Sequence, residues 1–208
     1  MSDNPRQAFS PPSVQWIDLY QIDLDQQNAD LNVLSDDERQ RAEKHHSNHY
    51  AVMRTAMRSI LGQLLHLAPS EVPIWIEDGG KPYLAERNFE FNLSHTGRHG
   101  LLAISQLPLG VDIERFRPQA NRVAIAKRVM PEDAIARIEA AEESDRAFYE
   151  EWTQLEARHK CIGIGIFDQL DPAIELQHTQ LELPSDLMGC VAWPRQATIP
   201  KLAYHTVR

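Results

Sequence analysis

The 208-residue chain has an ordinary globular composition, with 42% hydrophobic and 25% charged residues, and its formal net charge at pH 7 is −9. This acidic balance argues against general binding to nucleic acid or to anionic membranes, because both favour a basic surface. The length allows one large domain or two domains of about 100 residues each.

The expected location is the cytoplasm, and no membrane or nucleic-acid partner is expected. Cys161 and Cys190 lack metal-type spacing and are too few for a disulfide framework, which favours a reducing compartment. Residues 1–13 are polar and lack the apolar core of a signal peptide. No apolar run approaches the ~20 residues that a membrane-spanning helix requires.

The first part of the chain has clear helix and strand signals. Residues 14–24 alternate as in a strand, and the capping box Ser35–Glu38 predicts a helix from about Asp36 into the low 40s. Apolar side chains at spacings of three and four predict a longer helix over residues 47–67. Two short apolar runs around a Gly-Gly turn predict a hairpin over residues 74–84.

The stretch 91–114 predicts three short strands, because apolar runs alternate there with glycine and proline. A helix is expected to begin near Pro131, and a longer one over residues 145–162 is expected to end at Gly163. Residues 166–204 contain short apolar runs separated by X-Pro pairs, which predicts a small antiparallel meander.

Two carboxylates, Asp112 and Glu114, lie two residues apart in one expected strand. Side chains alternate along a strand, so both point to one face, roughly 7 Å apart at Cα from a rise of about 3.3 Å per residue. Like charges this close repel unless a cation separates them, and carboxylates suit a hard ion such as Mg²⁺. The alternative is an exposed strand face paired with the arginines that follow.

Glu156 and Lys160 lie one turn apart on the long C-terminal helix, beside an apolar stripe of Phe148, Trp152 and Leu155. This position lets Glu156 project into a cleft at the margin of a packed face. The alternative is an ordinary surface ion pair with Lys160, which contributes only about 0.3–0.5 kcal/mol.

Several basic side chains are candidates for phosphate binding, because Arg and Lys form charge-assisted hydrogen bonds with phosphate. The alternative for each, taken singly, is a solvated surface position. The candidates are Arg41, Arg54, Arg58, Lys81, His95 and Lys160.

Four sequence blocks follow one another along roughly residues 35–165. They are Gly80-Lys81-Pro82, Phe91-Asn92-Leu93-Ser94-His95-Thr96, Gly110-Val111-Asp112-Ile113-Glu114 and Trp152-Thr153-x-x-Glu156-Ala157-x-x-Lys160. Together they resemble the 4′-phosphopantetheinyl transferases, and more closely the long monomeric type that activates carrier proteins of peptide and polyketide synthetases and fatty-acid synthases.

The resemblance implies an α+β fold, a pseudo-dimer of two similar halves in which a long helix packs on a small antiparallel sheet. We place the halves at residues 1–107 and 108–208. A faint internal repeat with an offset of about 100 residues agrees with this division. The long type acts as a monomer, so a monomer is expected.

The resemblance also implies an activity, the Mg²⁺-dependent transfer of the 4′-phosphopantetheine arm from coenzyme A to a serine of an apo carrier protein, with release of 3′,5′-ADP. Asp112, Glu114 and Glu156 would hold Mg²⁺, or Mn²⁺, against the pyrophosphate. Glu156 would take the serine proton, and Lys160 would neutralise charge on the pyrophosphate. Such positioning and charge neutralisation are what phosphoryl transfer requires.

Coenzyme A would bind between the halves. The resemblance assigns Ser94 and His95 to its nucleotide phosphates, with Lys81 and Arg41 nearby. The segment Arg115–Arg128 contains five basic residues and no acidic one. Carriers of this kind are generally acidic, so this basic segment is expected to dock one.

Two positions depart from the family pattern. Leu155 stands where a lysine is usual, with Arg158 or His159 as the side chains that could offset its loss. His49 stands where an arginine for the nucleotide 3′-phosphate is frequent. These departures leave open a second function, that of a non-catalytic relative which binds a carrier protein or coenzyme A without transfer.

Overall fold

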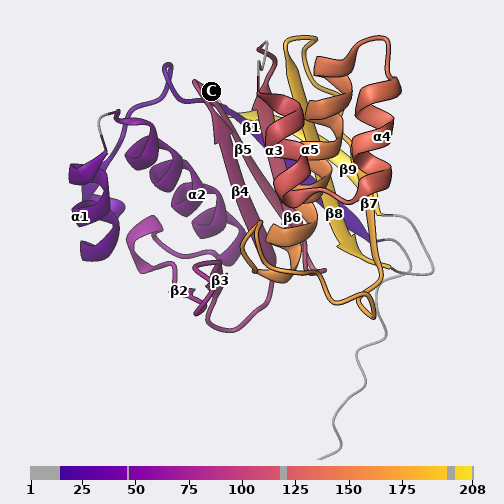
Figure 1. Cartoon of the computed structure of the whole chain (residues 1–208). Coiled ribbons are helices and arrows are strands. Elements are labelled where there is room, and N and C mark those ends of the chain that lie inside the picture. The colour runs from indigo at the N-terminus through magenta and orange to yellow at the C-terminus, as the bar shows by residue number, and fades with distance from the viewer. Residues whose placement is uncertain (1–14, 46, 118–120, 196–199, 208) are drawn as a thin grey trace, which may run out of the picture.

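The computed structural model describes residues 15–45, 47–117, 121–195 and 200–207. These residues form an α+β fold in which two sheets pack face to face between two groups of helices (Figure 1). The helices on one side are α1 (Asp36–Lys44) and α2 (His49–Leu65), and those on the other are α3 (Arg122–Val129), α4 (Glu132–Ala140) and α5 (Ser144–Ile162).

The first sheet has the strand order β4-β5-β1-β9. Strand β1 pairs antiparallel with β5 and parallel with β9, and β4 pairs antiparallel with β5. Helix α2 covers one face of this sheet, where Met57 and Leu61 pack against Phe91 and Leu102. The strands are β1 (Trp16–Asp23), β4 (Glu90–Thr96), β5 (His99–Ser105) and β9 (Lys201–Val207).

The second sheet, in the order β6-β8-β7, is antiparallel. Helix α5 covers its outer face, where Ala157 and Cys161 pack against Cys190. Val111 and Trp193 belong to the apolar layer that joins its inner face to the first sheet. The strands are β6 (Gly110–Arg115), β7 (Leu176–Gln180) and β8 (Leu187–Pro194).

Most elements expected from the sequence are confirmed. Ser35 and Glu38 form a reciprocal capping box at the start of α1, and Gly163, in the left-handed conformation, ends α5. The expected hairpin is β2 (Ile74–Ile76) paired with β3 (Pro82–Leu84). The three strands expected in the central stretch are β4, β5 and β6.

The expected C-terminal meander was wrong in its last strand. Strand β7 pairs with β8, but β9 crosses to the first sheet and lies parallel to β1. The alternation of side chains along a strand shows which residues share a face, and it does not show which strand is the pairing partner.

The basic segment Arg115–Arg128 contains helix α3, which the sequence did not predict. Residues 118–120 of this segment and the side chain of Arg122 lie outside the described residues.

The predicted boundary at residue 107 falls between β5 and β6, where the chain passes from the first sheet to the second. Strand β9 lies beyond that boundary and belongs to the first sheet. The two sheets also differ in strand number and order. The division into two similar halves therefore stays a prediction.

Both cysteines, Cys161 and Cys190, are buried free thiols. Burial raises the pKa of Cys161 to about 11 and that of Cys190 to about 12, so neither thiol is a reactive thiolate near neutral pH. Across the part of the chain that the structure describes, no helix has the length and apolar character to span a membrane.

Candidate active site

The edge strands β4 and β6 lie against each other although they belong to different sheets. We call this contact the seam. From Asn92 on, every second side chain of β4 accepts a hydrogen bond from a backbone N–H of β6, which ties the two sheets together. The bonds are Val111 N to Asn92 Oδ1 at 2.9 Å, Ile113 N to Ser94 Oγ at 3.3 Å and Arg115 N to Thr96 Oγ1 at 3.2 Å.

Asp112 lies at the centre of the seam and is 3% exposed. Its Oδ1 accepts a hydrogen bond from Ser94 Oγ at 2.7 Å and another from Lys160 Nζ at 2.6 Å. Lys160 Nζ also donates to Ser94 Oγ at 3.2 Å. The second carboxylate oxygen, Oδ2, is buried and has no hydrogen-bond partner among the described residues. One oxygen of Asp112 is thus fixed by the protein, and the other is left for a ligand.

Glu114 lies two residues along β6, on the same face as Asp112. Its Oε2 accepts a hydrogen bond from Thr96 Oγ1 at 3.1 Å. Burial raises the pKa of the Glu114 carboxyl, and the charge of Asp112 raises it further. The charge of Asp112 therefore opposes the ionisation of Glu114, as expected for two carboxylates on one face of a strand.

Glu156 approaches the seam from α5, with its Oε2 3.9 Å from Lys160 Nζ. Burial raises the pKa of Glu156; the Lys160 charge opposes this effect and the Asp112 charge adds to it. Gly110 allows the helix this close to β6, because a Cβ there would lie 2.1 Å from the Ala157 carbonyl oxygen. The expectation that Glu156 stands at the margin of the packed face agrees with its partial burial.

The three acidic residues fit a hard cation by their chemistry. Within residues 15–45, 47–117, 121–195 and 200–207, no three His, Cys, Asp or Glu side chains are grouped closely enough to hold a metal ion. The donors are nonetheless the carboxylate oxygens that Mg²⁺ prefers, and the buried Oδ2 of Asp112 has no hydrogen-bond partner among the described residues. The assignment of Asp112, Glu114 and Glu156 to Mg²⁺ stays a prediction.

A cavity of about 220 Å³ opens beside the seam and brings predicted site residues from both parts of the chain together. Arg54, Lys81 and Lys160 line it. Lys81 Nζ donates to the carbonyl oxygens of Cys161 at 2.8 Å and Leu109 at 3.0 Å, and burial lowers its pKa. One of its three N–H groups thus holds the end of α5 and a second holds the residue before β6, which leaves one for a ligand.

The other basic candidates separate into different environments. Arg58 is buried and its Nε lies 2.6 Å from Glu38 Oε2, so phosphate binding by Arg58, which stays a prediction, would compete with this ion pair. Arg41 is exposed and lines a separate cavity of about 90 Å³, to which Arg54 also contributes. Arg41 therefore does not share a cavity with Lys160, and only Arg54 belongs to both.

Ser94 and His95 point to opposite sides of β4, as neighbours in a strand must. Ser94 faces the seam, and its hydroxyl is used by Asp112, Ile113 and Lys160. Desolvation lowers the pKa of His95, with further contributions from the charges of His49, Lys160 and His45. Phosphate contacts by Ser94 and His95 stay predictions, and those by Ser94 would compete with its bonds inside the protein.

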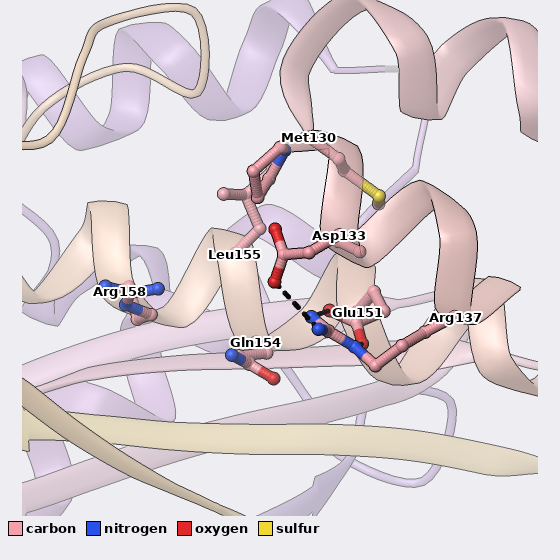
Figure 2. Close-up of a pocket in the computed structure, with 9 residues that line it drawn as sticks. Met130, Asp133, Arg137, Glu151, Gln154, Leu155 and Arg158 are labelled. Atoms are coloured by element: carbon pink, nitrogen blue, oxygen red, sulfur yellow. Dashed lines mark hydrogen bonds and ion pairs between the residues drawn. The ribbon is translucent and has the colours of Figure 1, made fainter.

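Leu155 lies on a different face of α5 from Lys160. Figure 2 shows it lining a pocket of about 140 Å³ with Met130 and Arg158, beside Arg137, which is joined to Asp133. Neither of the two predicted catalytic side chains is among the described residues that line this pocket. The departure at this position therefore does not change the cavity beside the seam.

His159 does not offset that departure. It is 3% exposed, and its ring nitrogens lie 2.8 Å from the Leu155 carbonyl oxygen and 3.1 Å from that of Asp168. The imidazole is thus used to hold the helix and the loop after it.

The sequence analysis did not assign roles to Asn92 and Thr96 of the seam. Both belong to a block that it recognised, and a signal was present. Asn92, Ser94 and Thr96 occupy alternate positions, so three polar side chains share one face of a strand whose other face packs in the core. Three polar groups on a face against another strand indicate hydrogen bonds across it.

Comparison with known proteins agrees with the resemblance seen in the sequence. Residues 108–187 match the model of the 4′-phosphopantetheinyl transferase superfamily. The 4′-phosphopantetheinyl transferase HetI of Nostoc sp. is 32% identical over 88% of this chain and 83% of its own length. Two Bacillus subtilis proteins, a 4′-phosphopantetheinyl transferase and the transferase Sfp, are 30% and 28% identical, over 67% and 64% of this chain and 62% of their own lengths in each case. The chain therefore belongs to the 4′-phosphopantetheinyl transferase superfamily and is an enzyme of that kind.

Proposed function

We propose that this enzyme, acting as a monomer in the cytoplasm, transfers the 4′-phosphopantetheine arm of coenzyme A to a serine of an apo carrier protein and requires Mg²⁺. The observation that carries the proposal is the meeting of Asp112, Glu156 and Lys160 at the seam. These residues are far apart in the sequence, and they combine acidic oxygens with a cation beside a cavity. That combination suits a metal-bound pyrophosphate.

Coenzyme A fits the cavity beside the seam by charge. Arg54, Lys81 and Lys160 line it, and these cations would bind the pyrophosphate through charge-assisted hydrogen bonds. Ser94 and His95 remain the predicted contacts of the nucleotide phosphates, with Lys81 and Arg41 as the predicted neighbouring cations.

The acidic residues and Lys160 carry out the proposed transfer. Bound Mg²⁺, held by Asp112, Glu114 and Glu156, would supply positive charge at the pyrophosphate. Glu156 accepts the proton of the carrier serine hydroxyl, a role in which a neighbouring cation would keep its carboxylate ionised. The serine oxygen forms a bond to the β-phosphorus as the bond from that phosphorus to the bridging oxygen breaks. The electron pair leaves with 3′,5′-ADP, whose charge Lys160 neutralises.

Mass measurement of the carrier tests this function. The enzyme is incubated with Mg²⁺, coenzyme A and several apo carriers, and each carrier is weighed for the added arm. We expect a mass increase with the wild type and a rate about 10²–10⁴-fold lower with Glu156→Gln, the scale of general-base catalysis. No mass increase with any carrier, but retained binding of a carrier or coenzyme A, would instead identify a non-catalytic binding protein.

The basic segment Arg115–Arg128 is proposed as the docking surface for an acidic carrier. Lys127 and Arg128 are exposed on α3. Reversing both to Glu is expected to raise the KM for the carrier about tenfold and to leave the KM for coenzyme A unchanged, because surface charge acts mainly on encounter with the charged partner. Reversing Arg195 and Lys201, an equal change in net charge elsewhere, is the control, and equal effects of the two double variants would contradict the proposal.

A further inference from the structure

The proposed transfer mechanism gives no role to the hydroxyls of Ser94 and Thr96. Each lies between a backbone N–H and a carboxylate of β6. We propose that Thr96, together with Ser94, is a positioning residue that orients the carboxylates of Glu114 and Asp112 for a divalent cation. This inference rests on the proposed function, because it assumes that these carboxylates hold the cation.

The single proton of the Ser94 hydroxyl can go to only one partner. Ile113 N–H and the Lys160 ammonium can only donate, so the Ser94 oxygen accepts from both. Its own proton is then left for Asp112 Oδ1, at 2.7 Å. Asp112 Oδ1 is thereby fixed by two donors, which holds Oδ2 in one orientation.

The same reasoning fixes the proton of Thr96. Arg115 N–H occupies a lone pair of the Thr96 oxygen at 3.2 Å, so the hydroxyl proton points to Glu114 Oε2 at 3.1 Å. Thr96 is β-branched and its χ1 is restricted, which favours one orientation of the hydroxyl. A carboxylate held in this way enters a ligand set with less loss of side-chain freedom.

The seam also fixes the register of β6 against β4. Three bonds at alternate positions join the strands, and a slip by one residue would turn Asp112 and Glu114 away from α5. Asn92 accepts the third bond, from Val111 N. Among the described residues, the Asn92 side chain forms no hydrogen bond with a carboxylate. It therefore offers a control in which the seam is weakened while the carboxylates keep their donors.

The test measures Mn²⁺ affinity in the presence of coenzyme A, by electron paramagnetic resonance of free Mn²⁺, and the melting temperature of each variant. Thr96→Val is expected to raise the Mn²⁺ dissociation constant about tenfold or more, the usual effect of removing a partner of a metal ligand. Thr96→Ser keeps the hydroxyl and should restore the affinity to within about threefold of the wild type. Because Asn92 also lines the cavity beside the seam, its variant is measured with coenzyme A at saturation. Asn92→Leu should then lower the melting temperature and change the dissociation constant less than Thr96→Val does.

A matched control is Thr55→Val on α2, which removes a hydroxyl that accepts from Asp30 N at 3.0 Å, away from the seam. It should leave Mn²⁺ affinity unchanged. If the wild type binds Mn²⁺ and transfers the arm, but Thr96→Val binds Mn²⁺ as tightly, the inference fails and the proposed function stands. Equal weakening in Thr96→Val and Thr96→Ser would also overturn the inference. A wild type that neither binds Mn²⁺ nor transfers would overturn both.

Discussion

Two ion pairs in this protein each join a basic side chain of a long helix to a buried carboxylate, and they differ in what remains unpaired. Arg58 of α2 meets Glu38 of α1, and Lys160 of α5 meets Asp112 of β6, each at 2.6 Å. The distance is the same and both carboxylates are buried, although Lys160 is partly exposed and Arg58 is not. The difference lies in the other partners of each group.

The Arg58–Glu38 pair is saturated in the sense that, among the described residues, neither side chain has a buried nitrogen or oxygen atom without a hydrogen-bond partner. Arg58 Nη1 donates to the carbonyl oxygens of Pro69 and Val72, both at 3.2 Å. Glu38 Oε2 also accepts from Ser35 N at 3.0 Å. The pair therefore joins α1, α2 and the loop after α2, and both side chains also line the cavity of about 90 Å³.

The Lys160–Asp112 pair is unsaturated. Asp112 Oδ2 lacks a partner among the described residues, Glu156 lies 3.9 Å from the same ammonium, and Lys160 lines a cavity. Uncompensated polar groups cost folding free energy, and clustered carboxyls with raised pKa values are typical of functional sites. We therefore expect the presence of an unpaired buried oxygen, more than burial itself, to separate a functional pair from a structural one in this protein.

The largest effect is expected at the saturated pair. Arg58→Met leaves Glu38 buried without its cation, so the free energy of unfolding should fall by about 3–5 kcal/mol. Transfer per folded molecule should change less than about threefold, because the pair lies outside the seam. Urea denaturation and the carrier assay measure the two quantities.

The second substitution Glu38→Gln is the control for Arg58→Met. Glutamine keeps the capping position of α1 and removes the unpaired charge, so it should recover part of the lost stability. A loss of transfer in proportion to the loss of stability would show that the comparison is wrong.

Asp112→Asn should have the opposite effects. Asparagine keeps the shape and an acceptor for Ser94 and Lys160, so the melting temperature should change by no more than about 2–4 °C, which corresponds to about 1 kcal/mol at this size. Transfer should fall by about 10²-fold or more, because the charge that faces the cation is lost. Calorimetry and carrier mass measurement check both, and a large stability loss with retained transfer would make this pair structural.

The local elements could be predicted because their signals are local. The capping box of α1, the glycine that ends α5 and the alternation in β4 and β6 depend on a few neighbouring residues. The pairing of β9 with β1 could not be predicted, since it joins residues about 180 positions apart through backbone groups that every sequence shares.

The site was predictable only as a set of motifs. Alternation correctly placed Asp112 and Glu114 on one face, and helix spacing placed Glu156 and Lys160 one turn apart. The resemblance added only the predicted roles of these residues. Sequence alone could not separate Arg58 from Arg54, which are one turn apart on α2, because their difference is created by Glu38 on another helix. In the same way, the hydroxyl of Thr96 has a role only when β6 lies beside it.

The smallest effect is expected at Glu114, and it concerns stability against pH. Burial raises the Glu114 pKa above its value in the unfolded chain, so the folded state binds a proton more readily than the unfolded state. Stability therefore falls as the pH rises from the ordinary carboxyl pKa through the raised one, and ionised Glu114 opposes folding at neutral pH.

Glu114→Gln removes this opposing charge and keeps an acceptor for Thr96. With a metal chelator present at pH 7, the melting temperature of the variant should exceed that of the wild type. The difference should disappear as the pH falls below the ordinary carboxyl pKa. Calorimetry across this pH range measures the effect. A lower melting temperature for the variant at pH 7 would mean that ionised Glu114 stabilises the fold, as Glu38 does. The carboxylates of the seam would then carry no excess negative charge for the proposed cation to neutralise.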